Sequence, residues 1–363
     1  MRFPEFAGEW NTDVIGNVAP LQRGFDLPTQ NVEEGNYPVV YSNGILRKHK
    51  DFKCEAPGLV TGRSGSIGNF TFIPEGKYWP HNTSLWVTNF HGNNPLFVYY
   101  LYQTINIGQY ATGSGVPTLN RNDVHRHEVS IPRVKEQRKI ADFLSLIDKR
   151  ITTQIRIIEE LKLYRNTLMF KLLTPKDKWL RLSIGDVAQV IGGGTPDTNI
   201  EDYWNGNIQW FTPSEIGKEK YVTESERTLT QKGLDNSSAK FLPPGTILLS
   251  TRATIGECSI AKQECCTNQG FQSLIAKKVT PEFLYYLIQT KKKDLLSKAS
   301  GSTFAEISAN EVRKINICIP NTQEEQKAIV QPLSAYDERI ETECKILHLY
   351  ELQKQYLLGQ MFI

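Results

Sequence analysis

The sequence predicts an α+β protein in which two similar mixed α/β modules are separated by two long helices that form an antiparallel coiled coil. Two observations predict this class: a long internal repeat, and two long stretches whose apolar residues follow alternating spacings of three and four. The repeating unit is a whole module followed by a helix, which is too long for a solenoid. The expected segments are residues 1–133, the first module; 134–175, the central helix; 176–320, the second module; and 321–363, the C-terminal helix.

The clearest match between the two modules is an aromatic segment expected to be helical. It reads Phe97-Val-Tyr-Tyr-Leu-Tyr-Gln-Thr104 in the first module and Phe283-Leu-Tyr-Tyr-Leu-Ile-Gln-Thr290 in the second. After it, each module runs through a Gly-Ser loop and an Ile-Pro pair to a Glu-Gln pair, namely Gly113-Ser114, Ile131-Pro132 and Glu136-Gln137, and then Gly301-Ser302, Ile319-Pro320 and Glu325-Gln326. Because two like modules share one chain, we expect one molecule to contact two similar targets.

The modules themselves read as mixed structure. Short β-like runs such as residues 37–41 and 84–88 alternate with Gly, Asn and Pro turns, and residues 95–107 are expected to form a helix. A chain of 363 residues has room for two domains, each with its own core. Trp210 and Phe211, which have no match in the first module, are expected to be core aromatics.

The two long helices each carry a regular apolar seam. Eight of the ten seam positions are apolar in each helix, and the two polar exceptions fall at the same places. The seam positions are Ile140, Leu144, Ile147, Ile151, Gln154, Ile158, Leu161, Arg165, Leu168 and Leu172, and then Ile329, Leu333, Tyr336, Ile340, Glu343, Leu347, Tyr350, Lys354, Leu357 and Met361. A period of 3.5 sustained over this length predicts a coiled coil, whereas a helix lying on its own module would tolerate a wider and less regular stripe.

The polar exceptions predict the direction of pairing. A parallel pair would set Arg165 against Lys354, whereas an antiparallel pair sets Arg165 against Glu343 and Gln154 against Lys354. Polar seam residues of this kind fix register, so we predict an antiparallel pair. At ~1.5 Å per residue the pair would be on the order of 50 Å long. Two readers on one face of DNA sit about 34 Å apart or more, so the helices could set the spacing between two half-sites.

Bulk composition excludes several classes of protein. The net charge of +3 is mildly basic and decides little by itself. No apolar run reaches the roughly 18 residues of a membrane span, and no signal peptide is apparent, so a cytoplasmic protein is expected. The six cysteines lack metal-ligand spacing and are expected to be free thiols. His125 and His127 lack a third ligand nearby, so we expect surface histidines and no metal site.

The segments Ile131-Pro-Arg-Val-Lys-Glu-Gln137 and Ile319-Pro-Asn-Thr-Gln-Glu-Glu-Gln326, each leading into a long helix, resemble the spacer regions of specificity subunits of Type I restriction–modification systems. The start of the chain, Arg2-Phe-Pro-Glu-Phe-Ala-Gly-Glu-Trp10, is also similar to that family, and the similarity covers essentially the whole chain. The resemblance implies two target-recognition domains, each reading one half of a bipartite, asymmetric sequence in double-stranded DNA. It also implies that the helices bind two methyltransferase subunits, with restriction endonuclease subunits joining outside them.

The same resemblance implies a chain without catalytic residues or a cofactor of its own. S-adenosylmethionine is expected on the methyltransferase subunit, and ATP and magnesium on the endonuclease subunit. The sequence agrees, because it contains neither a base-methylation motif of the Asn-Pro-Pro-Tyr type nor a GxxxxGK[ST] phosphate loop. Partner subunits are expected near Phe143, Tyr164 and Phe170. The rival interpretation is a structural adaptor whose duplicated domains bind proteins and read no DNA, and an enzyme with an unrecognised site is a third.

Sequence readout needs polar side chains aimed at base edges, with further groups on phosphates. Three pairs of Gly-bounded or polar loops at matching places in the two modules supply candidates. These are Arg63 and Ser64 with Arg252 and Thr254, Asn82 and Thr83 with Asn268 and Gln269, and Ser114 with Ser302 and Thr303. Each arginine could instead form a surface salt bridge, and each loop could be a plain turn.

Overall fold

The computed structural model describes residues 1–113, 115–300 and 305–362, so Ser114, Ser302 and Thr303 lie outside the described residues. The chain divides into two compact units, one made of Met1–Arg156 with Lys345–Ile363 and the other of Ile157–Cys344. Each unit contains one module and one part of each long helix. Both long helices therefore begin in one unit and end in the other.

The first module is built from two four-stranded sheets and two strand pairs, in the orders β2-β9-β6-β7, β4-β3-β8-β5, β1-β12 and β10-β11. The strands are β1 Asn11–Val14, β2 Leu21–Arg23, β3 Tyr37–Tyr41, β4 Gly44–His49, β5 Cys54–Glu55, β6 Gly58–Gly62, β7 Phe70–Ile73, β8 Lys77–Pro80, β9 Ser84–Val87, β10 Ala111–Thr112, β11 Thr118–Leu119 and β12 Glu128–Ile131. The helices are α1 Ile15–Val18, α2 Pro95–Thr104 and α3 Arg121–His125, with 3-10 turns at Thr29–Asn31 and Ile107–Tyr110.

The second module contains a five-stranded sheet, a three-stranded sheet and one strand pair. Its sheets have the orders β14-β21-β18-β19-β16, β17-β15-β20 and β13-β22. The strands are β13 Leu180–Ser183, β14 Ala188–Gly192, β15 Trp204–Phe211, β16 Tyr221–Val222, β17 Arg227–Leu229, β18 Ile247–Leu249, β19 Cys258–Ala261, β20 Cys265–Thr267, β21 Gln272–Ala276 and β22 Asn316–Ile319. The helices are α5 Ile184–Val187, α6 Gln231–Asp235, α7 Pro281–Thr290, α8 Lys292–Ser297 and α9 Ala309–Arg313, with 3-10 turns at Glu201–Tyr203 and Pro213–Glu215.

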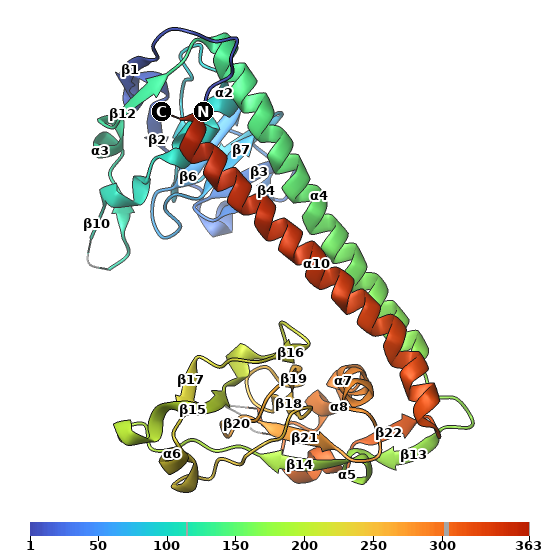
Figure 1. Cartoon of the computed structure of the whole chain (residues 1–363). Helices are drawn as coiled ribbons and strands as arrows, with labels where there is room; N and C mark the ends of the chain where they lie inside the picture. Colours follow the sequence, from blue (N-terminus) through green and yellow to red (C-terminus); the bar gives the residue numbers. More distant parts are fainter. Residues whose placement is uncertain (114, 301–304, 363) are drawn as a thin grey trace. The chain divides into compact units, whose positions relative to one another are not determined.

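The two modules share several strand pairings. In each, the first and last strands form an antiparallel pair, β1 with β12 and β13 with β22 (Figure 1). Each also contains a parallel pair beside an antiparallel neighbour, β3 with β8 and β15 with β20, and the second module has a further parallel pair, β16 with β19. The chain therefore enters and leaves each module through neighbouring strands. The long helix that follows each module starts beside the strand through which the chain entered that module.

The repeated aromatic helix forms the centre of each core. Asn94 caps α2 by accepting a hydrogen bond from the Phe97 N–H at 2.9 Å, and Pro95 at the first helical position has no N–H to satisfy. Thr280 and Pro281 do the same for α7. Phe97 and Phe283 are fully buried in the cores of their modules. Trp210 and Phe211 are also buried, which confirms their expected core role.

The glutamine of the repeated Glu-Gln pair fastens each long helix to its module. The Gln137 side chain is buried, accepts from the Asn94 N–H at 2.8 Å and donates to the Pro132 carbonyl at 2.9 Å. The Gln326 side chain, equally buried, accepts from the Thr280 N–H at 3.1 Å. These side-chain hydrogen bonds join the start of α4 to the N-terminus of α2, and the start of α10 to the N-terminus of α7. They also satisfy the buried amide groups, which need hydrogen-bond partners.

The long helices are α4, Val134–Leu172, and α10, Gln323–Met361. All twenty predicted seam positions are buried or partly buried, so the predicted seam is confirmed. In the first unit the early part of α4 shares a core with the late part of α10, as Leu144 and Leu357 show. In the second unit the late part of α4 shares a core with the early part of α10, as Met169 and Leu333 show. The two helices therefore run antiparallel, as predicted.

The cysteines are free thiols, and four of the six are buried. Within the described part of the chain, no helix is long and apolar enough to span a membrane.

Candidate nucleic-acid interface

The predicted loops of the first module meet at one place. The Arg63 N–H donates to the Thr83 carbonyl at 2.9 Å, and the Leu119 N–H donates to the Arg63 carbonyl at 2.8 Å. Ser64 forms an isolated antiparallel bridge with Thr118. The 63–64 loop is therefore held between the loop containing Asn82 and Thr83 on one side and the β10-β11 hairpin on the other.

The side chains of the second predicted loop are already engaged. The Asn82 amide nitrogen donates to the Asp26 carboxylate, while its buried oxygen has no hydrogen-bond partner. Thr83 Oγ1 lies 2.9 Å from His81 Nδ1, and burial lowers the pKa of His81. A buried acceptor without a protein partner is unusual in a folded protein.

Beside these loops the first module contains a cleft of about 310 Å³. Its lining residues come from β2, the 63–64 loop, β9, the β10-β11 hairpin and the start of α3, and are Arg23, Arg63, Leu85, Thr112, Thr118, Leu119, Asn120 and Arg121. Arg23 and Arg121 were not predicted from the sequence. Candidates were chosen where the two modules have similar polar residues at matching places, and the second module has no arginine at the places that match Arg23 and Arg121.

The predicted loops of the second module meet in the same way. The Thr251 N–H donates to the Gly270 carbonyl at 2.8 Å, and the Ile307 N–H donates to the Thr251 carbonyl at 3.2 Å. Asn268 and Gln269 precede Gly270 directly. Asn268 Oδ1 accepts from the Gly270 N–H at 2.8 Å, and Gln269 Oε1 accepts from the Thr195 hydroxyl.

Hydrogen-bond register corrects one predicted match between the modules. The backbone of Arg63 makes the bonds that Thr251 makes in the second module, and Ser64 faces Thr118 as Arg252 faces Glu306. Arg63 therefore corresponds to Thr251, and Arg252 to Ser64. The predicted match of the two arginines is wrong by one position, and because successive residues of an extended chain point to opposite faces, they do not occupy equivalent places.

Arg252 carries its charge beside an acid. Arg252 Nη2 lies 2.8 Å from Glu306 Oε1, and both side chains are about 40% exposed. The next residue, Ala253, has φ 54°, a left-handed conformation that is uncommon for a residue with a Cβ atom. The Thr254 hydroxyl donates to Ser250 Oγ at 3.1 Å. Strained backbone of this kind clusters at ligand-binding loops.

His125 and His127 were expected to be surface loop residues, but His125 lies in α3 and both side chains make hydrogen bonds. His125 Nε2 accepts a hydrogen bond from the Leu21 N–H at 2.8 Å, and His127 Nδ1 lies 2.8 Å from the Tyr110 hydroxyl. Both are half-buried. Among the residues that the structure describes, no cluster of three or more His, Cys, Asp or Glu side chains is placed to hold a metal ion.

The ion pairs of the helix pair differ from those predicted. Arg165 pairs with Asp337 at 3.0 Å instead of Glu343, and Lys354 pairs with Asp148 at 2.8 Å instead of Gln154. Asp148 and Asp337 occupy the same position counted from the starts of α4 and α10, as do Arg165 and Lys354. The pairing is thus duplicated and antiparallel, but shifted along the seam. The other two predicted register residues, Gln154 and Glu343, are buried, and Glu343 forms an ion pair with Arg339 of its own helix.

A tyrosine from each module explains this shift. Tyr100 of α2 donates to Asp148 Oδ2 at 2.6 Å, and Tyr286 of α7 donates to Asp337 Oδ2. The carboxylates therefore sit at the junction of helix and module. Long cationic side chains can reach a carboxylate beside the seam while their stems stay packed.

The second junction holds an additional lysine. Lys220 Nζ bonds the Tyr286 hydroxyl and Ser334 Oγ, both at 2.9 Å, and lies 3.9 Å from Asp337 Oδ2. Burial lowers the pKa of Lys220, and the nearby Asp337 carboxylate acts in the opposite direction. The second module is thus fixed to its helices by three charged groups and a tyrosine.

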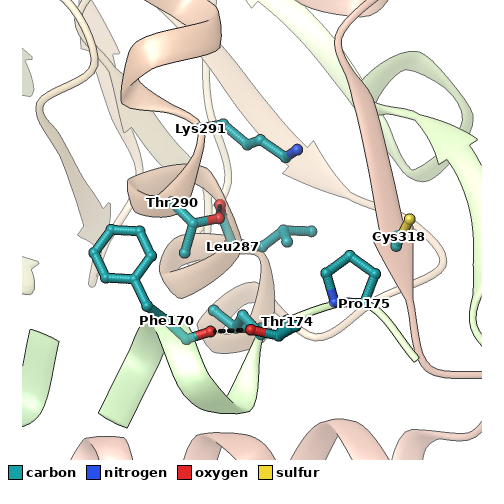
Figure 2. Close-up of a pocket in the computed structure, with 8 residues that line it drawn as sticks. Phe170, Thr174, Pro175, Leu287, Thr290, Lys291 and Cys318 are labelled. Atoms are coloured by element: carbon teal, nitrogen blue, oxygen red, sulfur yellow. Dashed lines mark hydrogen bonds between the residues drawn. The ribbon is translucent and has the colours of Figure 1, made fainter. Parts of the chain in front are cut away.

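The aromatic residues expected at partner surfaces lie in different environments. Tyr164 and Phe170 are exposed on α4, whereas Phe143 is partly covered by Phe3, whose ring centroid lies 5.8 Å away. Phe170 lines a hollow of about 200 Å³ in the second unit, together with residues of α7 and β22 (Figure 2). Figure 2 shows the Thr174 hydroxyl bonded to the Phe170 carbonyl, a contact of 2.8 Å that closes the end of α4.

Comparison with known proteins gives a consistent result. The family model described as "Type I restriction modification DNA specificity domain" matches residues 7–163 and 176–349. The chain is 41% identical over 176 residues to the type I restriction enzyme MjaIX specificity subunit of Methanocaldococcus jannaschii, covering 47% of this chain and 40% of that protein. It is 25% identical over 218 residues to the EcoR124I/EcoR124II specificity subunit of Escherichia coli, covering 58% and 53%. These matches span about half the length of each relative.

The fold is shared with solved structures. The crystal structure of a Type-I restriction-modification system S subunit from M. genitalium superposes with a TM-score of 0.61 at 16% identity, covering 100% of this chain and 99% of that one. A chain from a structure of complex assembly in a type I system gives a TM-score of 0.60 at 17% identity, covering 98% of each chain.

Proposed function

Because this chain belongs to the family of type I restriction–modification DNA specificity domains, we propose that it is the sequence-reading subunit of such a system, with each module reading one half of a bipartite DNA site. The observation that carries this proposal is the duplicated loop cluster. In each module three loops are joined by the same backbone hydrogen bonds, yet they present different polar side chains. A repeated scaffold with different side chains is suited to reading two different half-sites.

Backbone hydrogen bonds also explain how these loops could discriminate between bases. A base-reading side chain must start from a fixed backbone position if it is to distinguish one base edge from another. Arg63 is bonded through both its N–H and its carbonyl, and Arg252 lies next to Thr251, which is bonded in the same way. The loops therefore combine polar side chains with restrained backbones.

The helices supply the proposed docking surfaces for two methyltransferase subunits. Leu163 of α4 and Leu352 of α10 are 65% and 47% exposed, and they occupy the same position counted from the helix starts. Two like apolar positions suit two copies of one partner, because exposed apolar patches mark protein interfaces. The hollow beside Phe170 adds apolar surface in the second unit.

We further propose that this chain carries no chemistry of its own. The methyltransferase subunits would hold S-adenosylmethionine, and the endonuclease subunits would hold ATP and magnesium and join outside them. We place the assembled complex in the cytoplasm, where it meets DNA.

Module exchange tests the proposal. Replacing residues 176–320 by the second module of a relative should change one half of the methylated sequence and leave the other half as it was. The measurement is genome-wide mapping of methylated bases in cells that carry the partner genes with either chain. An unchanged methylated sequence after the exchange would contradict the assignment of that module as a reader.

Measuring DNA binding distinguishes the proposed reader from a structural adaptor that does not read DNA. The purified full chain should bind duplex DNA with an affinity that falls as salt rises, because contacts to phosphates release counterions. One bipartite sequence should bind more tightly than unrelated duplexes. An adaptor would show neither the salt dependence nor the preference.

A further inference from the structure

The two modules differ in charge at corresponding backbone positions. Arg23 ends β2 opposite Leu85 of β9, and Gly192 ends β14 opposite Gln272 of β21. Arg63 makes the backbone bonds that Thr251 makes.

The third position lies at the start of a short helix. Arg121 begins α3 after the capping residue Asn120, and Ala309 begins α9 after the capping residue Ser308. The three arginines of the first module thus correspond to a glycine, a threonine and an alanine.

In the first module these arginines line one cleft, of about 310 Å³. Arg23 pairs with Asp26 at 2.6 Å, and its side chain is 47% exposed. Among the described residues, neither Arg63 nor Arg121 forms an ion pair. The cleft therefore presents two guanidinium groups whose charge is not matched by a protein carboxylate.

The remaining polar groups in the cleft suit the same kind of ligand. Thr112, Thr118 and Asn120 line it beside the arginines, and their side chains can donate to the oxygens of DNA. In the second module the nearby arginine, Arg252, has its charge matched by Glu306 at 2.8 Å. The excess of positive charge is therefore a property of the first module.

We propose that Arg63 reads a guanine in the half-site of the first module, with Arg121 and Arg23 contacting the adjoining phosphates. This inference rests on the proposed function. Arg63 is partly buried and its backbone is held from both sides, as a base-reading residue requires. A guanidinium group bonded to O6 and N7 of guanine is the commonest specific contact in the major groove. Arg121 and Arg23 are exposed, as phosphate contacts are.

Binding selection from a random-sequence duplex library, with the purified full chain, tests this. The wild-type chain should select a two-part sequence. Arg63→Ala should lose the preference for at least one G·C pair, and only within one of the two parts. Affinity for the selected site should fall on the order of ten- to a hundredfold, the range expected for one bidentate base contact. Arg63→Lys keeps the charge but cannot form the same fork, and should lose the preference as well.

Arg121→Ala separates phosphate contact from base reading. It should leave the selected sequence unchanged, weaken binding to every duplex, and reduce the salt slope by about one unit. Arg181→Ala, which removes an exposed arginine of β13, serves as the control for loss of charge. Melting temperatures equal to that of the wild type would show that each variant is folded.

Each outcome points to a different failure. A wild-type chain that selects no sequence would overturn the proposed function itself. A wild-type preference that Arg63→Ala retains in full would overturn this inference and leave the proposed function standing. Loss of preference in both parts, or only at A·T pairs, would also overturn it.

Discussion

His125 of the first module and Arg313 of the second lie at corresponding positions, but the histidine accepts a hydrogen bond and the arginine donates one. His125 Nε2 accepts from the Leu21 N–H at 2.8 Å, whereas Arg313 Nη2 donates to the Val190 carbonyl at 3.2 Å. Leu21 and Val190 lie at matching places in β2 and β14. Only the histidine contact depends on pH, because a proton on Nε2 removes its acceptor.

Because neutral His125 accepts this hydrogen bond, we predict that the free energy of unfolding of the first unit decreases in mild acid. Burial, together with the charge of Arg121, lowers the pKa of His125 below its ordinary value of 6.5. The contribution of neutral His125 is therefore complete above a pH of about 6.5 and is lost as the pH falls through the lowered folded-state pKa. His125→Asn should flatten this dependence in calorimetric melting of the full chain between about pH 7.5 and 5. Equal slopes for the variant and the wild type would show that His125 has no part in it.

The tyrosine hydroxyls at the helix–module junctions give a second residue-level prediction. Tyr286→Phe removes a donor to the Asp337 carboxylate, which is already shared with Arg165 and lies near Lys220. We expect a loss of about 1–3 kcal/mol, which for a unit of this size lowers the melting temperature by roughly 2–4 °C per kcal/mol. Tyr164→Phe removes a hydroxyl from a residue that is 60% exposed, and should leave the melting temperature unchanged. Equal melting temperatures for both variants would contradict a structural role for the junction.

At the scale of elements, the ion pair between α4 and α10 is open to a double-mutant cycle. Asp148 and Lys354 lie 2.8 Å apart with side chains 32% and 19% exposed, so their coupling should exceed that of a surface pair. We expect about 1 kcal/mol of coupling between Asp148→Ala and Lys354→Ala in the free energy of unfolding. The exposed pair Lys232 and Asp202 is the matched control and should show less. Additive losses at Asp148 and Lys354 would mean that the observed contact does not stabilise the helix pair.

The helix seam was predictable, whereas its ion pairs were not. Burial along a helix follows a period that the sequence displays, so all twenty seam positions could be chosen in advance. Arg165 pairs with Asp337, and Tyr286, which is distant from Arg165 in the sequence, donates a hydrogen bond that holds Asp337 beside the seam. Similarly, the repeat in the sequence located the three candidate loops. The match of Arg63 with Arg252 was wrong by one residue, and this error could be seen only from the backbone hydrogen bonds. Arg23 and Arg121 were missed because the matching positions of the second module hold Gly192 and Ala309, so the repeat did not point to an arginine there.

At the scale of the whole molecule, both units share the same two helices. The units meet along the sequence between Arg156 and Ile157 of α4 and between Cys344 and Lys345 of α10, in the middle of unbroken helices. A continuous helix transmits any change in its length to what lies beyond it. We infer that the helix pair sets the gap between the two halves of the recognised sequence.

Insertion of one heptad into each helix at these two points tests that inference. Seven residues preserve the phase of the seam and lengthen each helix by about 10 Å, which corresponds to roughly three base pairs of duplex. Methylation mapping should then show both half-sites unchanged and the gap between them longer by about three base pairs. Inserting the heptad in α4 alone should abolish methylation, because the antiparallel layers no longer match. A chain with both insertions that still recognises the original gap would show that the length of the helices does not set the spacing.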